Sequence, residues 1–185
     1  AHLARMREEC DLAYVRNDII DLVSESREGL SRVTSIIQDL KSFAHVDSHE
    51  WQTVDLLAGL ESTLNVVYNE LRYKADIVRA FEPLPLVACL PGQINQVFMN
   101  LLVNAAHAIA ERGTIALRSG VAGEQVWIEI EDTGCGMTPD VQRRIFDPFF
   151  TTKPVGKGTG LGLPLSYGIV ERHGGRIDVD SVPGT

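Results

Sequence analysis

The stretch of sequence that decides the fold runs from Asp132 to Leu163 and contains three glycine- or proline-rich segments. They read Asp132-Thr-Gly-Cys-Gly-Met137, Phe146-Asp-Pro-Phe-Phe-Thr-Thr-Lys153 and Gly156-Lys-Gly-Thr-Gly-Leu-Gly-Leu163. Glycine at alternate positions weakens a strand or a helix, because it loses the most backbone entropy and packs no side chain. Glycine repeated this densely, with a lysine between the clusters, indicates backbone N–H groups that approach phosphate oxygens. A single Gly-x-Gly would instead indicate a flexible surface loop.

Composition predicts a soluble globular protein of one ordinary domain with an appendage. The chain has 185 residues, 44% of them hydrophobic, and a mean hydropathy of 0.00. Its formal net charge of −8 argues against nucleic acid as a partner. Cys10, Cys89 and Cys135 lie far apart without a Cys-x-x-Cys pair, which is typical of reduced thiols. With no apolar run long enough for a membrane span, we expect a cytoplasmic location, although an upstream region of the full-length protein can still carry an anchor.

A long helix is predicted from Asp18 to Ala44, after a charged lead-in over residues 1–17. Apolar residues recur there at spacings of four and three, the pattern of a helix in a bundle. The seam consists of Ile19, Val23, Ser26, Leu30, Val33, Ile37, Leu40 and Ala44. One helix cannot bury this seam alone, so its partner is a further helix or a second copy of the chain. Packing against its own domain is the alternative.

The remainder alternates between short strands and helices after a polar linker over residues 45–52. Strands are predicted over residues 53–55, 76–81, 86–89, 114–119, 124–132 and 176–180, with a hairpin turn at 121–123. Helices are predicted over residues 56–71, 91–112 and 161–172, with one or two helical turns in 138–145. In the strand that ends at Asp132, Val126, Ile128 and Ile130 face one way and Trp127, Glu129 and Glu131 the other. The pattern predicts an α+β fold whose sheet is covered by helices on one face.

Two asparagines on one helical face are the first candidate site. Asn100 and Asn104 are four residues apart in an otherwise apolar helix, and His107 follows near the same face. Asparagine is a poor residue for a helix interior, so the pair indicates a functional polar contact such as the coordination of Mg²⁺. Both amides could instead cap or bridge neighbouring backbone, and His107 could simply be packed or solvated. Asp132, at a strand end, could initiate a turn or accept a hydrogen bond from a ligand amine.

In this order, these landmarks resemble the catalytic ATP-binding domain of sensor histidine kinases, within the gyrase, chaperone, histidine-kinase and mismatch-repair ATPase superfamily. The resemblance covers residues 54–185 and includes four boxes. Asn100–Ala105 is similar to the N box, Asp132–Met137 to the first glycine box, Phe146–Lys153 to the F box and Gly156–Leu163 to the second glycine box. Residues 32–44 resemble the second helix of the dimerisation and phosphotransfer hairpin.

The resemblance implies a two-layer α/β sandwich, with a mixed sheet under helices, preceded by a long bundle helix. It divides the chain into a hairpin part over residues 1–50 and a catalytic domain over residues 51–185, whose final strand we expect beyond Thr185.

The resemblance also implies roles for individual residues in binding ATP and Mg²⁺. Asn104 would ligate Mg²⁺ with help from Asn100, and Asp132 would bind the adenine amino group. Gly134 and Gly136 would let the adenine ring approach. The other nucleotide contacts implied by position, including the phosphate-binding lid, are His107, Met137, Phe146, Thr152, Lys153, Gly156, Lys157, Gly158, Thr159, Gly160, Leu161 and Gly162.

The chain departs from the family in its phosphoacceptor. A family acceptor is a histidine followed by an acidic residue on the first hairpin helix. His2, His45, His107 and His173 lack that neighbour, and His49, which precedes Glu50, falls in the linker. We therefore assign no catalytic residue in this chain and expect the acceptor histidine to lie upstream of Ala1.

The resemblance thus implies a protein-histidine kinase. It would pass the γ-phosphoryl group of ATP to the upstream histidine and then to an aspartate of a response-regulator receiver domain. The full-length protein would dimerise through the helix over residues 18–44, and this fragment would bind nucleotide without autophosphorylating. Two alternatives stay open. An ATP-hydrolysing clamp of the same superfamily would carry a glutamate in place of Asn100, and a pseudokinase would act as a scaffold.

Overall fold

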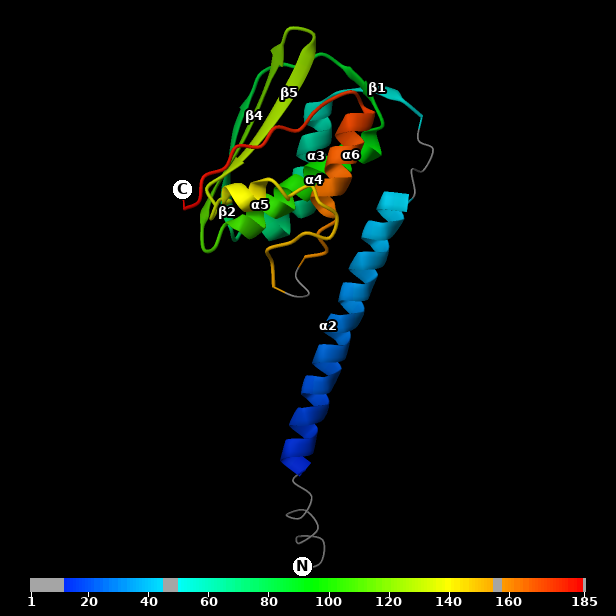
Figure 1. The fold of residues 1–185 in the computed structure, drawn as a ribbon, viewed down its shortest axis with the longest axis vertical. Helices are drawn as coiled ribbons and strands as arrows, with labels where there is room; N and C mark the ends of the chain where they lie inside the picture. The colour runs from blue at the N-terminus through cyan, green and yellow to red at the C-terminus, as the bar shows by residue number, and fades with distance from the viewer. Residues whose placement is uncertain (1–11, 45–49, 155–157, 185) are drawn as a thin grey trace, which may run out of the picture. The chain divides into compact units, whose positions relative to one another are not determined.

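The computed structural model describes residues 12–44, 50–154 and 158–184. The chain divides into two compact units, each of which is described by itself (Figure 1). The first unit comprises residues 1–45 with residues 153–159, and the second comprises residues 46–152 with residues 160–185.

Helix α2 (Leu12–Ala44) is the regular element of the first unit and has 33 residues. It begins six residues before the predicted start at Asp18, so the prediction of a lead-in as far as residue 17 was wrong. No glycine or proline lies between Leu12 and Arg27 to stop the helix from extending. The apolar seam is exposed where its side chains are described: Leu30 is 70% and Val23 60% exposed. No helix in the described residues is both long and apolar enough to cross a membrane.

The second unit is a mixed sheet with helices on one face (Figure 1). Strand β2 (Ala75–Phe81) pairs in parallel with β4 (Gly113–Ala122), and β4 pairs antiparallel with β5 (Gln125–Asp132). A small antiparallel ladder joins β1 (Gln52–Val54) to β3 (Val87–Cys89). The helices are α3 (Leu56–Leu71), α4 (Pro91–Ala108), the short α5 (Pro139–Gln142) and α6 (Gly162–Arg172). The predicted two-layer α/β sandwich is confirmed.

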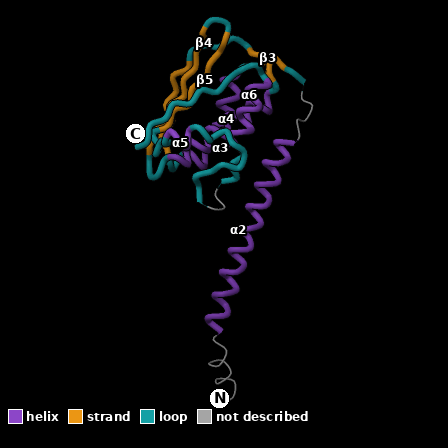
Figure 2. The backbone as a smooth tube through the Cα atoms, viewed as in Figure 1, coloured by secondary structure: helices purple, strands orange, loops and turns teal. Residues whose placement is uncertain are grey.

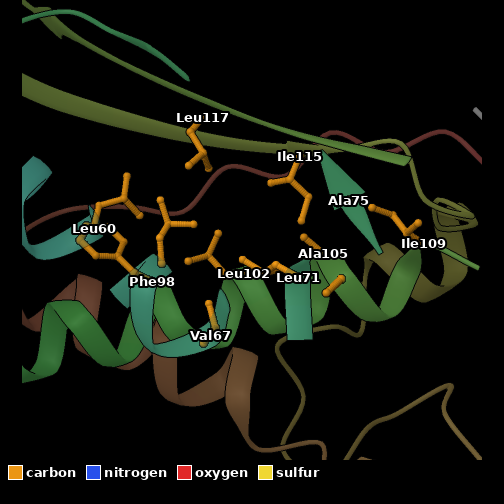
Figure 3. Packing of buried hydrophobic residues seen from close by; sticks show 12 residues of the cluster. Leu60, Val67, Leu71, Ala75, Phe98, Leu102, Ala105, Ile109, Ile115 and Leu117 are labelled. Atoms are coloured by element: carbon orange, nitrogen blue, oxygen red, sulfur yellow. The ribbon is translucent and has the colours of Figure 1, made fainter. Parts of the chain in front are cut away.

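The core lies between α3, α4 and the sheet (Figure 3). Leu60 and Leu102 of the helices and Ile115 and Leu117 of β4 have no exposed surface. Alternation along β5 follows the prediction: Val126, Ile128 and Ile130 are half-buried, whereas Trp127, Glu129 and Glu131 are exposed. Apolar burial on one face of each element therefore holds the helices on the sheet.

The helix α3 has the predicted bounds because its first turn is capped. Oδ1 of Asp55 accepts hydrogen bonds from the backbone N–H groups of Leu57 and Ala58, at 2.8 and 3.3 Å. For α4, Pro91 stands in the first turn, where a missing N–H costs nothing. The hairpin is also confirmed, although β4 continues to Ala122 and the chain turns at Gly123, which has φ +64°.

The predicted end of α4 at Arg112 was wrong, because the helix ends at Ala108. Ile109 is extended, and the neighbouring carbonyls find partners outside the helix. The carbonyl of Ala108 accepts from the N–H of Cys135 at 3.0 Å. Nζ of Lys74 donates to the carbonyls of Ile109 (3.1 Å) and Ala110 (2.6 Å). These contacts replace the hydrogen bonds that a further helical turn would have formed.

The predicted strand over residues 176–180 is not formed; the segment is an irregular extended chain (Figure 2). Its side chains still alternate, with Ile177 and Val179 half-buried. The carbonyl of Val179 accepts from Nε2 of Gln142 at 2.6 Å, and Oγ of Ser181 accepts from the N–H of Met137 at 2.9 Å. The segment is thus fixed by α5 and by the loop after β5 instead of by a strand ladder.

Candidate functional site

Helix α4 is the element to which the candidate site residues are attached. Asn100 and Asn104 lie one turn apart and are half-buried, and His107 is exposed near the end of the helix. The loop after β5 contacts the C-terminal end of α4, and the start of α6 contacts its middle.

The amide of Asn100 bridges α4 to α6. Its Nδ2 donates to the carbonyl of Gly162 at 3.0 Å and to Oγ of Ser166 at 3.1 Å, while its Oδ1 accepts from Nε2 of Gln96 at 3.1 Å. Ser166 is fully buried and in turn donates to the carbonyl of Gly162 at 2.9 Å. Asn100 had two interpretations, a magnesium ligand or a bridge between neighbouring groups, and the contacts in the structure are those of a bridge. It fixes the first turn of α6 against α4.

The first glycine segment folds back on the end of α4. Besides the bond from Cys135 to the carbonyl of Ala108, the N–H of Gly134 donates to Oδ1 of Asp132 at 2.9 Å. A Cβ at Gly134 would lie 2.5 Å from the Cβ of Ala108, so only glycine allows this approach. Asp132 shares the face of β5 that carries Ile128 and Ile130. Its carboxylate is therefore presented on the helix side of the sheet, beside the end of α4.

The pKa of Asp132 is raised above its ordinary value. Partial desolvation at the strand end is the main cause, and the neighbouring negative charge of Glu131 adds to it. The hydrogen bond from Gly134 acts in the opposite direction and lowers the pKa. The surroundings therefore disfavour the ionised carboxylate, although solvent still reaches the side chain.

Gly136 brings the same loop against the C-terminal segment. Its φ is +63°, and a Cβ there would lie 2.0 Å from the carbonyl oxygen of Val182. The N–H of Gly184 donates to the carbonyl of Cys135 at 3.0 Å. The nearest atoms to Gly134 and Gly136 thus belong to the chain itself, so both glycines have a folding role besides the predicted approach of a ring.

The F-box residues join α5 to the start of α6. The ring of Phe146 lies 5.0 Å from the ring of Tyr167 on α6. Phe149 has φ +66°, which is uncommon for a residue other than glycine, and its N–H donates to the carbonyl of Gly160 at 2.9 Å. Gly160 has φ +67°, and a Cβ there would lie 2.4 Å from the carbonyl carbon of Phe149. This contact joins the F box directly to the second glycine box.

Helix α6 begins at Gly162, within the second glycine segment, and the N–H groups of its first turn have no acceptor inside the helix. Its N-cap residue, Leu161, is buried and provides no side-chain cap. The helix dipole there favours a negatively charged ligand such as a phosphate.

The structure brings most of the predicted site residues together in the second unit. Asn100 and Gly162 are in direct contact, and the loop of Asp132, Gly134, Gly136 and Met137 is attached to the helix of Asn104 and His107. Thr152 lies in this unit and is exposed. Lys153, Gly158 and Thr159 belong to the first unit, and Gly156 and Lys157 lie outside the described residues.

Sequence reasoning missed two polar residues that organise this region. Ser166 is fully buried and bonded to both Asn100 and Gly162, and His173 contacts the start of α4. For Ser166 the available signal was a hydroxyl four residues after Gly162 in an apolar helix, where it can bond the i−4 carbonyl.

The donor set fits a magnesium ion that arrives with its nucleotide. Among the residues that the structure describes, there is no cluster of three or more His, Cys, Asp or Glu side chains able to hold a metal. Mg²⁺ commonly takes one or two protein oxygens and completes its shell with water and phosphate oxygens. The side-chain oxygen of Asn104, with Asn100 one turn away, supplies this small number of protein oxygens. The described residues therefore fit an ion coordinated mainly by water and phosphate oxygens, and not an ion enclosed by protein ligands alone.

Comparison with known proteins identifies the family. The family model described as "Histidine kinase-, DNA gyrase B-, and HSP90-like ATPase" matches residues 90–185. The chain belongs to this ATPase family. Among curated members, the signal transduction histidine-protein kinase AtoS of Escherichia coli K12 is 38% identical over 158 residues, which are 84% of this chain and 26% of AtoS. The sensor histidine kinase ZraS of Salmonella typhimurium is 36% identical over 171 residues, which are 91% of this chain and 36% of ZraS.

A solved structure of the same family has the same fold. The catalytic domain of the histidine kinase ThkA superposes with a TM-score of 0.61 and 28% identity, over 67% of this chain and 82% of that domain. The predicted resemblance to the catalytic domain of sensor histidine kinases is therefore confirmed. This chain spans about a third or less of the curated relatives named above.

Proposed function

We propose that this chain is the ATP-binding catalytic part of a two-component sensor histidine kinase. The observation that carries the proposal is the attachment of both glycine segments to one helix. Cys135 bonds the end of α4, and Asn100 of α4 bonds the first residue of α6. A nucleotide held along α4 would meet the carboxylate of Asp132 at one end and the N-terminus of α6 at the other.

Each residue then has a role that its environment supports. Asp132 accepts a hydrogen bond from the adenine amino group. This bond stabilises the ionised form of the carboxylate, which the protein surroundings alone disfavour. Asn104, assisted by Asn100, would hold Mg²⁺, which would supply charge neutralisation at the phosphates. The N–H groups of α6, with Lys153 and the other lid residues, stabilise the remaining negative charge. Phosphoryl transfer needs this positioning and neutralisation more than it needs covalent chemistry from the protein.

The phosphoryl group would go to a histidine upstream of Ala1 and then to a receiver-domain aspartate of a response regulator. Helix α2 would form the second helix of the dimerisation hairpin in the full-length protein. Its exposed seam supports this assignment, since Val23 and Leu30 are each at least 60% exposed. Such a seam is typical of a helix whose partner helices complete a bundle.

The presence of an asparagine at position 100 argues against the alternative function of an ATP-hydrolysing clamp. Clamp ATPases of this superfamily carry a glutamate at that position, whereas this chain has an amide that donates two hydrogen bonds to α6. A general base is therefore lacking at the position where hydrolysis would require one.

The test is to titrate the chain with Mg·ATP in a calorimeter and then to incubate it with radiolabelled ATP. We expect saturable binding of one nucleotide without label on this chain. In the full-length protein we expect label on an upstream histidine, stable in base and labile in acid. Absence of any binding heat and of any melting shift would refute the proposal, and steady release of phosphate would favour the clamp.

A further inference from the structure

His173 connects four parts of the second unit at a point outside the nucleotide site. It is the C-cap residue of α6, and its imidazole Nε2 lies 3.0 Å from the backbone nitrogen of Leu90, the N-cap residue of α4. Its Nδ1 lies 2.7 Å from the carbonyl oxygen of Ile169 in α6. The ring of Trp51 is tilted against the imidazole at 4.9 Å. Trp51 precedes β1 and Leu90 follows β3, and because Gln52 pairs with Cys89, both residues flank the same end of that small ladder, which lies at His173.

The two hydrogen bonds define the state of the imidazole. A carbonyl oxygen can only accept, so Nδ1 carries the proton that bonds Ile169. A backbone N–H can only donate, so Nε2 is bare and accepts from Leu90. The neutral imidazole therefore acts as a bridge with one donor and one acceptor. Leu90 has no side-chain cap of its own, so this bridge supplies a partner for an N–H just ahead of the first turn of α4.

With this bridge, α6 is fastened to α4 at both of its ends. Asn100 holds the beginning of α6 at Gly162 and Ser166, and His173 holds its end at Leu90. One attachment would leave a helix free to pivot, whereas two attachments fix its direction. The beginning of α6 carries the second glycine box, so the direction of α6 decides where its N–H groups point.

We propose that His173 is a positioning residue for the nucleotide site, and that Trp51 makes this positioning depend on how the chain enters β1. The inference rests on the proposed nucleotide-binding function. Trp51 directly precedes β1. A shift of Trp51 relative to β1 would alter its contact with His173 and, through α6, the affinity for nucleotide. By linkage, nucleotide binding would in turn change the free energy of the contact between Trp51 and His173 by the same amount.

The experiment uses the whole chain with Trp127→Phe, which leaves Trp51 as its only tryptophan. Trp127 lies against Gly120 on the sheet. Mg·ADP is titrated while Trp51 fluorescence and binding heat are recorded. We expect the emission of Trp51 to change with the same midpoint as the heat. His173→Ala should raise the Kd about tenfold, the equivalent of one or two lost hydrogen bonds, and should abolish the change in emission. His173→Gln, whose amide oxygen can accept from Leu90, should stay within about threefold of the parent Kd.

The matched control is Ser119→Ala. Ser119 is fully buried in β4 and donates one hydrogen bond to the carbonyl of Glu82, the residue that follows β2, at 3.0 Å. It should lower the melting temperature and leave the Kd unchanged, which separates a loss of stability from a loss of positioning. If His173→Ala does not fold, Trp51→Ala replaces it, because Trp51 is 55% exposed and its loss is better tolerated. We then expect the Kd to rise about threefold, since the contact between the two rings is lost.

Normal Mg·ADP binding with a silent Trp51, or with equal Kd values for His173→Ala and Ser119→Ala, would overturn this inference and leave the proposed function intact. Failure of the parent chain to bind Mg·ADP at all would overturn the proposed function, and this inference with it.

Discussion

Replacing Asn100 by aspartate is the sharpest test of the bridge between α4 and α6. The substitution keeps the shape of the side chain, removes its two donated protons and adds a negative charge. The carboxylate can still accept from Gln96, but it would face the carbonyl oxygen of Gly162 across the 3.0 Å now spanned by a hydrogen bond. Ser166 can turn its hydroxyl towards the new carboxylate only by giving up its own bond to that carbonyl.

The magnitude follows from these contacts. Two hydrogen bonds at about 1 kcal/mol each, and the cost of a poorly paired charge at a half-buried position, give a loss of about 2–4 kcal/mol. For a domain of this size, each kcal/mol lowers the melting temperature by about 2–4 °C, so we expect a fall of roughly 5–15 °C. The assay is thermal unfolding followed by tryptophan fluorescence, with urea unfolding to obtain the free energy.

The matched control is Asn65→Asp, the same chemical change at an exposed position of α3. It should melt close to the parent chain, because exposed substitutions away from special contacts change stability by about 0.5 kcal/mol or less. If Asn100→Asp and Asn65→Asp melt at the same temperature, Asn100 does not join the two helices and our account of the site is wrong.

Further substitutions test the rest of the site and its surroundings. Gly136→Ala, which puts a Cβ 2.0 Å from the carbonyl oxygen of Val182, should cost more than about 2 kcal/mol of unfolding free energy. Gly123→Ala, at φ +64° with open space around it, should cost only about 1 kcal/mol, and equal losses in chemical denaturation would contradict the packing argument. Asp132→Asn should melt higher than the parent chain at pH 7 while losing affinity for Mg·ATP. The raised pKa of Asp132 means that its ionised form destabilises the fold, and that this penalty is absent below the unfolded pKa and fully present once the pH exceeds the folded pKa. The difference in melting temperature between Asp132→Asn and the parent chain should therefore shrink as the pH falls through this interval; a constant difference would refute the pKa argument. Finally, the effects of Trp51→Ala and His173→Ala on the Kd for Mg·ADP should be strongly non-additive, whereas additive effects would show that the two rings act separately.

Local sequence patterns were sufficient where the deciding interactions are local. The bounds of α3 follow from Asp55 and from apolar residues at helical spacing, both of which are visible in the sequence. The hairpin of β4 and β5 follows in the same way from alternation and from Gly123. The fold class was therefore predictable.

Elements decided by distant partners were not predictable from local patterns. Residues 109–112 have helical character in the sequence, but Lys74 and Cys135 take up the carbonyls at the end of α4. Residues 176–180 alternate like a strand, yet their partners are side chains and loops. The folding role of Gly136 likewise depends on Val182, forty-six residues further along the chain. The spacing of apolar residues along the sequence carries no information about such long-range contacts.

The contact between His173 and Leu90 also has a consequence for biosynthesis. The two residues are separated by 83 positions in the chain. At translation rates of about 5–20 residues per second, Leu90 leaves the peptidyl-transferase centre roughly 4–17 s before its partner does. During that interval the bond between His173 and Leu90 cannot form, so the end of α6 is attached to the start of α4 only after residue 173 has been made.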